Sequence, residues 1–204
     1  MAKELLEDKI KLFWKWFNQN KTILQEVVAN PYHLKKEWVI EQLDQHVLAF
    51  GKLKWEIENP TNNAFIFTFS PNGDFDLLQK TKTIIAASNP IPNWTFNAAR
   101  KATGNYSIEV YDHLMDVQEI NAENWRIVLI DSSKNSCDMI LEANNLHEID
   151  VDTRLIAANL ILNNIIGEEA KINHVNKLEI VLKLATHDSD FCFPIKELAY
   201  QLFE

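Results

Sequence analysis

The hydrophobic period of the chain changes from about 3.6 residues to 2 in one stretch, Leu53-Lys-Trp-Glu-Ile-Glu-Asn-Pro-Thr-Asn-Asn-Ala-Phe-Ile-Phe-Thr-Phe-Ser-Pro-Asn-Gly-Asp74. Its first apolar residues alternate with lysine and glutamate, which predicts a strand with one solvated face. Phenylalanines alternate again at 65–69, after a turn-forming segment at 59–63. The two strands are therefore expected to form an antiparallel hairpin, and Asp74 is expected to cap the helix that follows.

Upstream of this stretch, the spacing predicts two helices, over 4–29 and 33–50, with Gly51 as the C-terminal cap of the second. They are expected to form an antiparallel helical hairpin over 1–51. The first helix carries an apolar arc wider than an amphipathic helix needs, with Trp14 and Trp16 on it. Such an arc could face two neighbours within the fold, a partner protein or a membrane surface, and core packing is favoured because its polar face mixes both charges.

Downstream, a helix over 75–88 and a strand over 94–96 complete a ββαβ unit at 53–98. The same order returns at 125–184, with a hairpin turn at 131–136, a helix over 152–166 capped by Asp152, and a strand over 178–184. A last helix is expected at 194–204. Between the units, 99–124 is ambiguous and could hold two short strands. The prediction is one α+β domain over 1–204, with a mainly antiparallel sheet, helices and two possible ββαβ pseudo-repeats.

Composition excludes several functional classes. The four glycines among 204 residues are too far apart for a dinucleotide fingerprint, a P-loop or a nucleophile elbow. A net charge of −9 argues against nucleic-acid partners. Two cysteines make no disulfide framework, the N-terminus is acidic, and no apolar run approaches about 18 residues. We therefore expect a cytoplasmic protein without a membrane span.

Several segments together resemble a group of small bacterial proteins of unknown function. They are Phe13-Trp-Lys-Trp-Phe17, Ser70-Pro-Asn-Gly-Asp74, Ala86-Ala-Ser-Asn-Pro-Ile-Pro-Asn-Trp94 and Leu162-Asn-Asn-Ile-Ile-Gly-Glu168. The resemblance covers roughly residues 10–184. No activity is established for that group, so the resemblance implies no functional residue and points to no known enzyme family.

Three polar constellations contain residue types that could support catalysis or ligand binding. Glu168 and Glu169 with His174 could rim a pocket, although their spacing is not that of a metal-binding helix. In the loop 187–190, His187 could lower the pKa of the Cys192 thiol, but Cys192 lies between two phenylalanines, which favours a thiol among apolar neighbours. Asp112-His113 could be half of a catalytic triad, but nothing in the sequence marks a nucleophile. No catalytic, metal-binding or cofactor-binding residue is assigned.

The six tryptophans give the strongest functional signal. Three of them fall at inward positions of predicted strands, whereas Trp16 and Trp38 lie on helix flanks and are the candidates for contact with a partner. The sequence therefore favours a non-catalytic protein-interaction module, with the oligomeric state open. The alternative is a small-molecule binding protein or enzyme with a pocket between sheet and helices, rimmed by Glu168 and Glu169.

Overall fold

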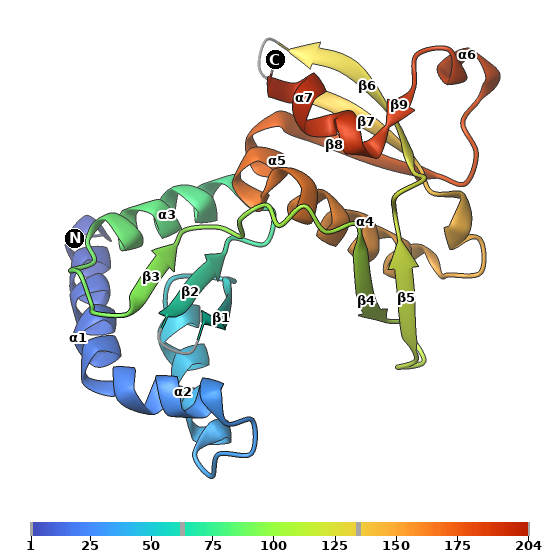
Figure 1. Cartoon of the computed structure of the whole chain (residues 1–204). Helices are drawn as coiled ribbons and strands as arrows, with labels where there is room; N and C mark the ends of the chain where they lie inside the picture. The colour runs from blue at the N-terminus through green and yellow to red at the C-terminus, as the bar shows by residue number, and fades with distance from the viewer. Residues whose placement is uncertain (1, 62–63, 134–135, 204) are drawn as a thin grey trace. The chain divides into compact units, whose positions relative to one another are not determined.

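The computed structural model describes residues 2–61, 64–133 and 136–203, and it has the predicted α+β architecture (Figure 1). The chain forms two compact units, Met1–Arg100 and Lys101–Glu204. The division follows from the core, because two clusters of buried apolar side chains share no residue. Lys134 and Asn135 of the predicted turn at 131–136 lie outside the described residues.

Unit 1 begins with the predicted helical hairpin, made of α1 (Ala2–Ala29) and α2 (Lys36–Leu48). Two contacts show that the helices run antiparallel, because residues later in α1 meet residues earlier in α2. Lys9 Nζ donates to Ala49 O at 3.0 Å near one end, and the rings of Trp16 and His46 lie 4.3 Å apart in the middle. The stripe of α1 that contains Phe13, Trp14 and Phe17 is buried in this unit, whereas Leu5 and Leu12 on its flank are exposed.

The sheet of unit 1 contains β1 (Lys54–Thr61), β2 (Ala64–Ser70) and β3 (Trp94–Asn97), in that order. β1 and β2 pair antiparallel, and α3 (Phe75–Ala86) leads to β3, which pairs parallel with β2. Asp74 accepts a hydrogen bond from Leu77 N at 2.9 Å and caps α3 as predicted. The alternating phenylalanines of β2 pack on α1, where the ring centroids of Phe13 and Phe69 lie 5.4 Å apart.

Unit 2 opens with a two-stranded sheet of β4 (Ser107–Tyr111) and β5 (Val117–Asn121), so the ambiguous segment holds two strands paired with each other. A second sheet has the order β8-β7-β6-β9. Its strands are β6 (Arg126–Ser133), β7 (Ser136–Glu142), β8 (Val175–Val181) and β9 (Phe193–Pro194). The helices of unit 2 are η1 (Asn144–Leu146), α4 (Val151–Ile166), α5 (Glu168–His174), α6 (Thr186–Ser189), η2 (Ile195–Glu197) and α7 (Leu198–Phe203).

Both units contain the order hairpin, helix, parallel strand, because β6 and β7 pair antiparallel and β7 and β8 pair parallel. Three details of the second unit differ from the prediction. Asp150 caps α4 in place of Asp152, since its carboxylate reaches Thr153 N at 3.0 Å. Gly167 is followed directly by a second helix, α5, and β8 runs over Val175–Val181, earlier than the predicted strand at 178–184. The expected C-terminal helix over 194–204 divides into β9, η2 and α7.

Candidate functional site

The two tryptophans selected from the sequence lie in different surroundings within unit 1. Trp16 is half-buried against the core, with its ring beside His46, and burial lowers the pKa of His46. Trp38 leaves 43% of its surface exposed on α2. The structure therefore gives Trp16 a packing role and leaves Trp38 on the surface.

The candidate pocket residues all lie on α5 of unit 2. Glu168 is buried, Glu169 is exposed, and neither lines the two cavities described below. Burial lowers the pKa of Lys171, one turn further on, and the charge of Glu168 opposes this shift. The ring of His174 lies against that of Phe203, with centroids 5.6 Å apart. Within the described ranges, no group of three or more His, Cys, Asp or Glu residues could hold a metal ion.

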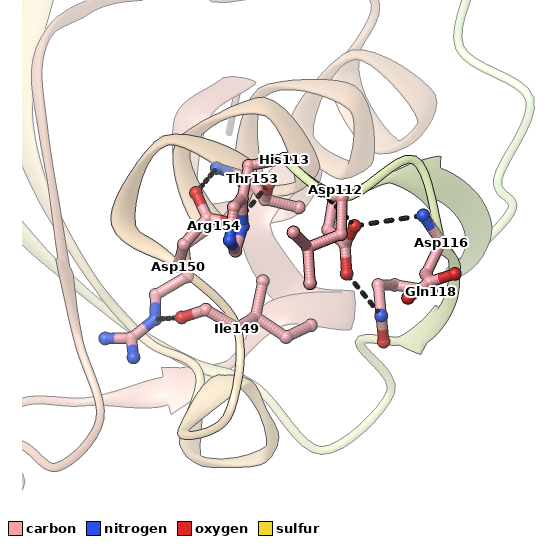
Figure 2. A network of polar contacts seen from close by, with 9 residues as sticks. Asp112, His113, Asp116, Gln118, Ile149, Asp150, Thr153 and Arg154 are labelled. Carbon is pink, nitrogen blue, oxygen red and sulfur yellow. Dashed lines mark hydrogen bonds and ion pairs between the residues drawn. The ribbon is translucent and has the colours of Figure 1, made fainter.

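The other two constellations have different surroundings in unit 2. His187 pairs with Asp188 at 3.2 Å on the exposed α6, and Cys192 Sγ lies 3.6 Å from Arg126 Nη1. Asp112 and His113, in contrast, form part of a connected network at the turn between β4 and β5 (Figure 2). That turn and its hairpin form the most distinctive surface of unit 2.

The outward side of the hairpin presents alternate residues of β4 and β5. Ile108, Val110 and Ile120 point inward and belong to the core of unit 2 or pack against it. Three register pairs point outward: Ser107 with Asn121, Glu109 with Glu119, and Tyr111 with Val117. We call these six residues, together with Leu114 and Met115 of the turn, the hairpin face. A cavity of about 680 Å³ adjoins it and is lined by Ser107, Ile108, Glu109, Glu119, Ile120 and Asn121.

Asp112 organises the turn. Its Oδ1 accepts hydrogen bonds from Leu114 N at 2.8 Å and Asp116 N at 3.0 Å, and its Oδ2 accepts one from Gln118 Nε2 at 2.8 Å (Figure 2). Desolvation acts to raise the pKa of Asp112, but these hydrogen bonds outweigh it and hold the pKa below its ordinary value. The carboxylate therefore stiffens the turn in its ionised form.

The turn is also tied to the start of α4. His113 Nδ1 lies 3.2 Å from Asp150 Oδ2, and Asp150 receives hydrogen bonds from Thr153 N at 3.0 Å and Thr153 Oγ1 at 2.7 Å (Figure 2). The backbone N–H and hydroxyl of Thr153 lower the pKa of Asp150 far below its ordinary value. Arg154 Nε donates to Ile149 O at 2.6 Å and closes the same segment. The turn is thus held from two sides.

This rigid turn holds large apolar side chains in solvent. Leu114 is 68% exposed and Met115 73%, and the neighbouring Tyr111 and Val117 are also exposed. Met115 has a φ of 66°, a left-handed conformation that costs a residue other than glycine about 1–2 kcal/mol. Strained backbone of this kind concentrates at functional sites, where the surroundings maintain it.

The net negative charge of the protein lies in unit 2. Unit 1 has twelve lysines and arginines against eleven aspartates and glutamates, whereas unit 2 has eight against eighteen. Residues 105–153 alone contain eleven acids and two basic residues, a formal charge of −9. Glu109 and Glu119 stand directly opposite each other in the ladder, an arrangement that destabilises a sheet. The hairpin face therefore combines an apolar tip with a pair of directly opposed carboxylates.

The sequence draws attention to Asp112 and His113 only as a pair without the neighbours of a catalytic triad, and it does not single out the apolar residues around them. A signal for this surface was present in the sequence. The stretch 105–125 lacks lysine and arginine, although Tyr111, Leu114, Met115 and Val117 lie among its five acids. Only the register of the hairpin brings Glu109, Glu119, Tyr111 and Val117 to one side.

Comparisons with known proteins found no protein family, no curated protein and no solved structure that matches this chain. Among the described residues, no helix has the length and apolar character needed to cross a lipid bilayer.

Proposed function

We propose that this chain is a non-catalytic protein-interaction module, and that its hairpin face binds a segment of a partner that carries both basic and apolar side chains. The observation that carries the proposal is the rigid turn at 112–116, which holds Leu114 and Met115 in solvent at the end of a hairpin that also presents the opposed carboxylates of Glu109 and Glu119. Exposed apolar anchors surrounded by charge are typical of interaction sites.

The energetics favour binding at this turn. Covering one large apolar side chain contributes roughly 1.5–3 kcal/mol. The hydrogen bonds around Asp112 fix the turn before a partner arrives, which reduces the ordering cost of association. The carboxylates of Glu109 and Glu119 raise the association rate of a basic partner, and a lysine or arginine placed between them would relieve their mutual repulsion.

The charge of unit 2 also defines which partners fit. A surface of this sign repels the phosphates of nucleic acids and of anionic lipids, so the proposed partner is a protein with a basic, amphipathic segment. A cytoplasmic location remains part of the proposal, on the basis of the two cysteines, which make no disulfide framework.

The test uses a synthetic amphipathic helical peptide of leucine and lysine, with a leucine and glutamate peptide of the same pattern as its counterpart. Met115→Gly removes an anchor at a backbone conformation that glycine adopts readily, so the folded state should be as stable as before or more stable. We expect Met115→Gly to weaken lysine-peptide binding at least about tenfold in isothermal titration calorimetry, because an anchor worth over 1.4 kcal/mol is lost.

Leu34→Gly is the matched control, since Leu34 is fully exposed in the loop between α1 and α2 of unit 1. It should leave the affinity unchanged, and the glutamate peptide should not bind. Unchanged affinity of Met115→Gly, or an equal loss in Leu34→Gly, would show that the hairpin face is not the binding surface.

A further inference from the structure

Unit 1 contains a groove that is unrelated to the hairpin face. It lies between one side of α1 and the end of α3 with the loop that follows, and its volume is about 630 Å³. Pockets that hold small molecules span about 300–1,000 Å³. The groove therefore has the capacity of a small-molecule site.

The floor of the groove is apolar and held in place. Ile10, Trp14 and Ile91 line it, and each is at least nine-tenths buried. Trp14 Nε1 donates to Ile84 O at 2.9 Å, and its ring meets Phe96 edge to face at 4.7 Å. The polar end of the indole is satisfied inside the protein, so the part that faces the groove offers only apolar contact. The apolar floor favours an apolar ligand. Because its side chains are already held in place, little further ordering is needed on binding.

The rim of the groove carries two cations. Lys11 and Lys15 are exposed and lie one turn apart on α1, which places both ammonium groups on the same side of the helix. The rim also includes Glu7, an opposing charge, and the amide side chains of Asn18 and Gln19. Lys11 lies 3.8 Å from Asp8, but both side chains are more than 70% exposed, and such a pair contributes little. Lys11 can therefore turn to a ligand at small cost.

We propose that this groove binds a small amphipathic carboxylate, whose hydrocarbon or aromatic body rests on Trp14 and Ile91 and whose carboxylate pairs with Lys11 and Lys15. The proposal extends beyond the interaction of the hairpin face, because it involves the other unit and a different class of ligand. The apolar floor explains the affinity, and the two lysines explain the preference for a negative headgroup.

The test compares three ligands with the same ten-carbon chain: decanoate, decanol and decyltrimethylammonium. Isothermal titration calorimetry below their aggregation concentrations should give decanoate an affinity about tenfold above that of decanol, as two partly solvated ion pairs allow. Decyltrimethylammonium should bind more weakly than decanol. A failure of decanoate to bind at millimolar concentration, or equal affinity for all three ligands, would overturn the proposal.

Variants locate the site. Lys11→Gln with Lys15→Gln should reduce decanoate affinity to that of decanol, whereas Lys35→Gln with Lys36→Gln removes two charges away from the groove and should change nothing. Ala87→Phe places a ring in the groove from an exposed position and should abolish binding of both ligands. Circular dichroism and thermal unfolding confirm that each variant is folded.

Decanoate affinity that survives Ala87→Phe in a folded protein would contradict this location. Met115→Gly should leave decanoate binding intact, so the outcome here is independent of the outcome for the hairpin face.

Discussion

Replacing Glu119 by lysine should stabilise unit 2 and at the same time weaken its proposed interaction. Glu119 stands opposite Glu109 in the ladder of β4 and β5, and both side chains are exposed. Like charges in directly opposed positions destabilise a sheet, and opposite charges stabilise it. The substitution Glu119→Lys exchanges one arrangement for the other without altering the core.

The magnitude follows from the register. Directly opposed residues place their Cβ atoms about 5 Å apart, and carboxylates roughly 6 Å apart repel by about 0.7 kcal/mol in water. A Debye length of about 8 Å at physiological ionic strength reduces this repulsion to about 0.3 kcal/mol. Because lysine reverses the sign, the free energy of unfolding should rise by about 0.7 kcal/mol at physiological salt and by about 1.1 kcal/mol near 0.01 M salt.

The assay is urea unfolding followed by pulsed hydrogen exchange and mass spectrometry, which reads peptides from residues 101–204 separately from those of unit 1. Glu123→Lys makes the same charge change on an exposed residue beyond the end of β5 and serves as the control. Equal stabilisation by Glu119→Lys and Glu123→Lys, or a gain that persists near 1 M salt, would refute the argument. The lysine-rich peptide should bind Glu119→Lys more weakly than the natural protein.

Three further predictions concern the two cores and the acid response. Phe67→Ala empties a fully buried position in the aromatic core of unit 1, and urea unfolding should show a loss of about 3–5 kcal/mol confined to residues 1–100. Gly51→Ala should also destabilise unit 1, by more than about 1 kcal/mol. Gly51 has a φ of +139°, and an added Cβ would lie 2.8 Å from Leu77 Cδ2. Thermal unfolding followed by circular dichroism measures this loss of stability. Arg126 Nε donates a hydrogen bond to Glu142 at 2.5 Å, which lowers the pKa of Glu142 below the ordinary 4.5. The ionised Glu142 therefore adds to the free energy of unfolding above pH 4.5, and this contribution is lost as the pH falls through the lowered pKa. Stability measured from pH 6 down to about pH 2 should therefore fall less steeply in Glu142→Gln than in the natural protein.

Local patterns were sufficient for most elements of unit 1. The alternation at 53–58 and 65–69 corresponds to β1 and β2, and Asp74 caps α3 as predicted. In unit 2 the cap of α4 was assigned to Asp152 although Asp150 forms it. Both aspartates precede the apolar residues of the helix at a spacing that suits an N-terminal cap. Only the hydrogen bond from Thr153 N to Asp150 distinguishes them. Helix α5 was missed because Gly167 and two glutamates also suit the end of a helix.

The candidate site was less predictable than the fold. Asp112 and His113 were noticed as a pair, but their roles depend on partners that no local pattern identifies. Asp112 binds Gln118, six residues away, and His113 meets Asp150 at a separation of 37 residues. The predicted partner residue Trp16 is half-buried because α2 returns along α1 and places His46 on its ring.

Periodicity and turn chemistry in the chain specify which segments become helices and strands, since a residue's neighbours at i+2, i+3 and i+4 determine which side chains share a face. Net charge and the absence of glycine motifs likewise follow from composition alone. The division into two cores at Arg100, the opposition of Glu109 and Glu119, and the exposure of Leu114 and Met115 arise only in the folded chain. Each of these features depends on pairing and burial between residues distant in sequence, and such contacts are selected by the packing of the whole unit.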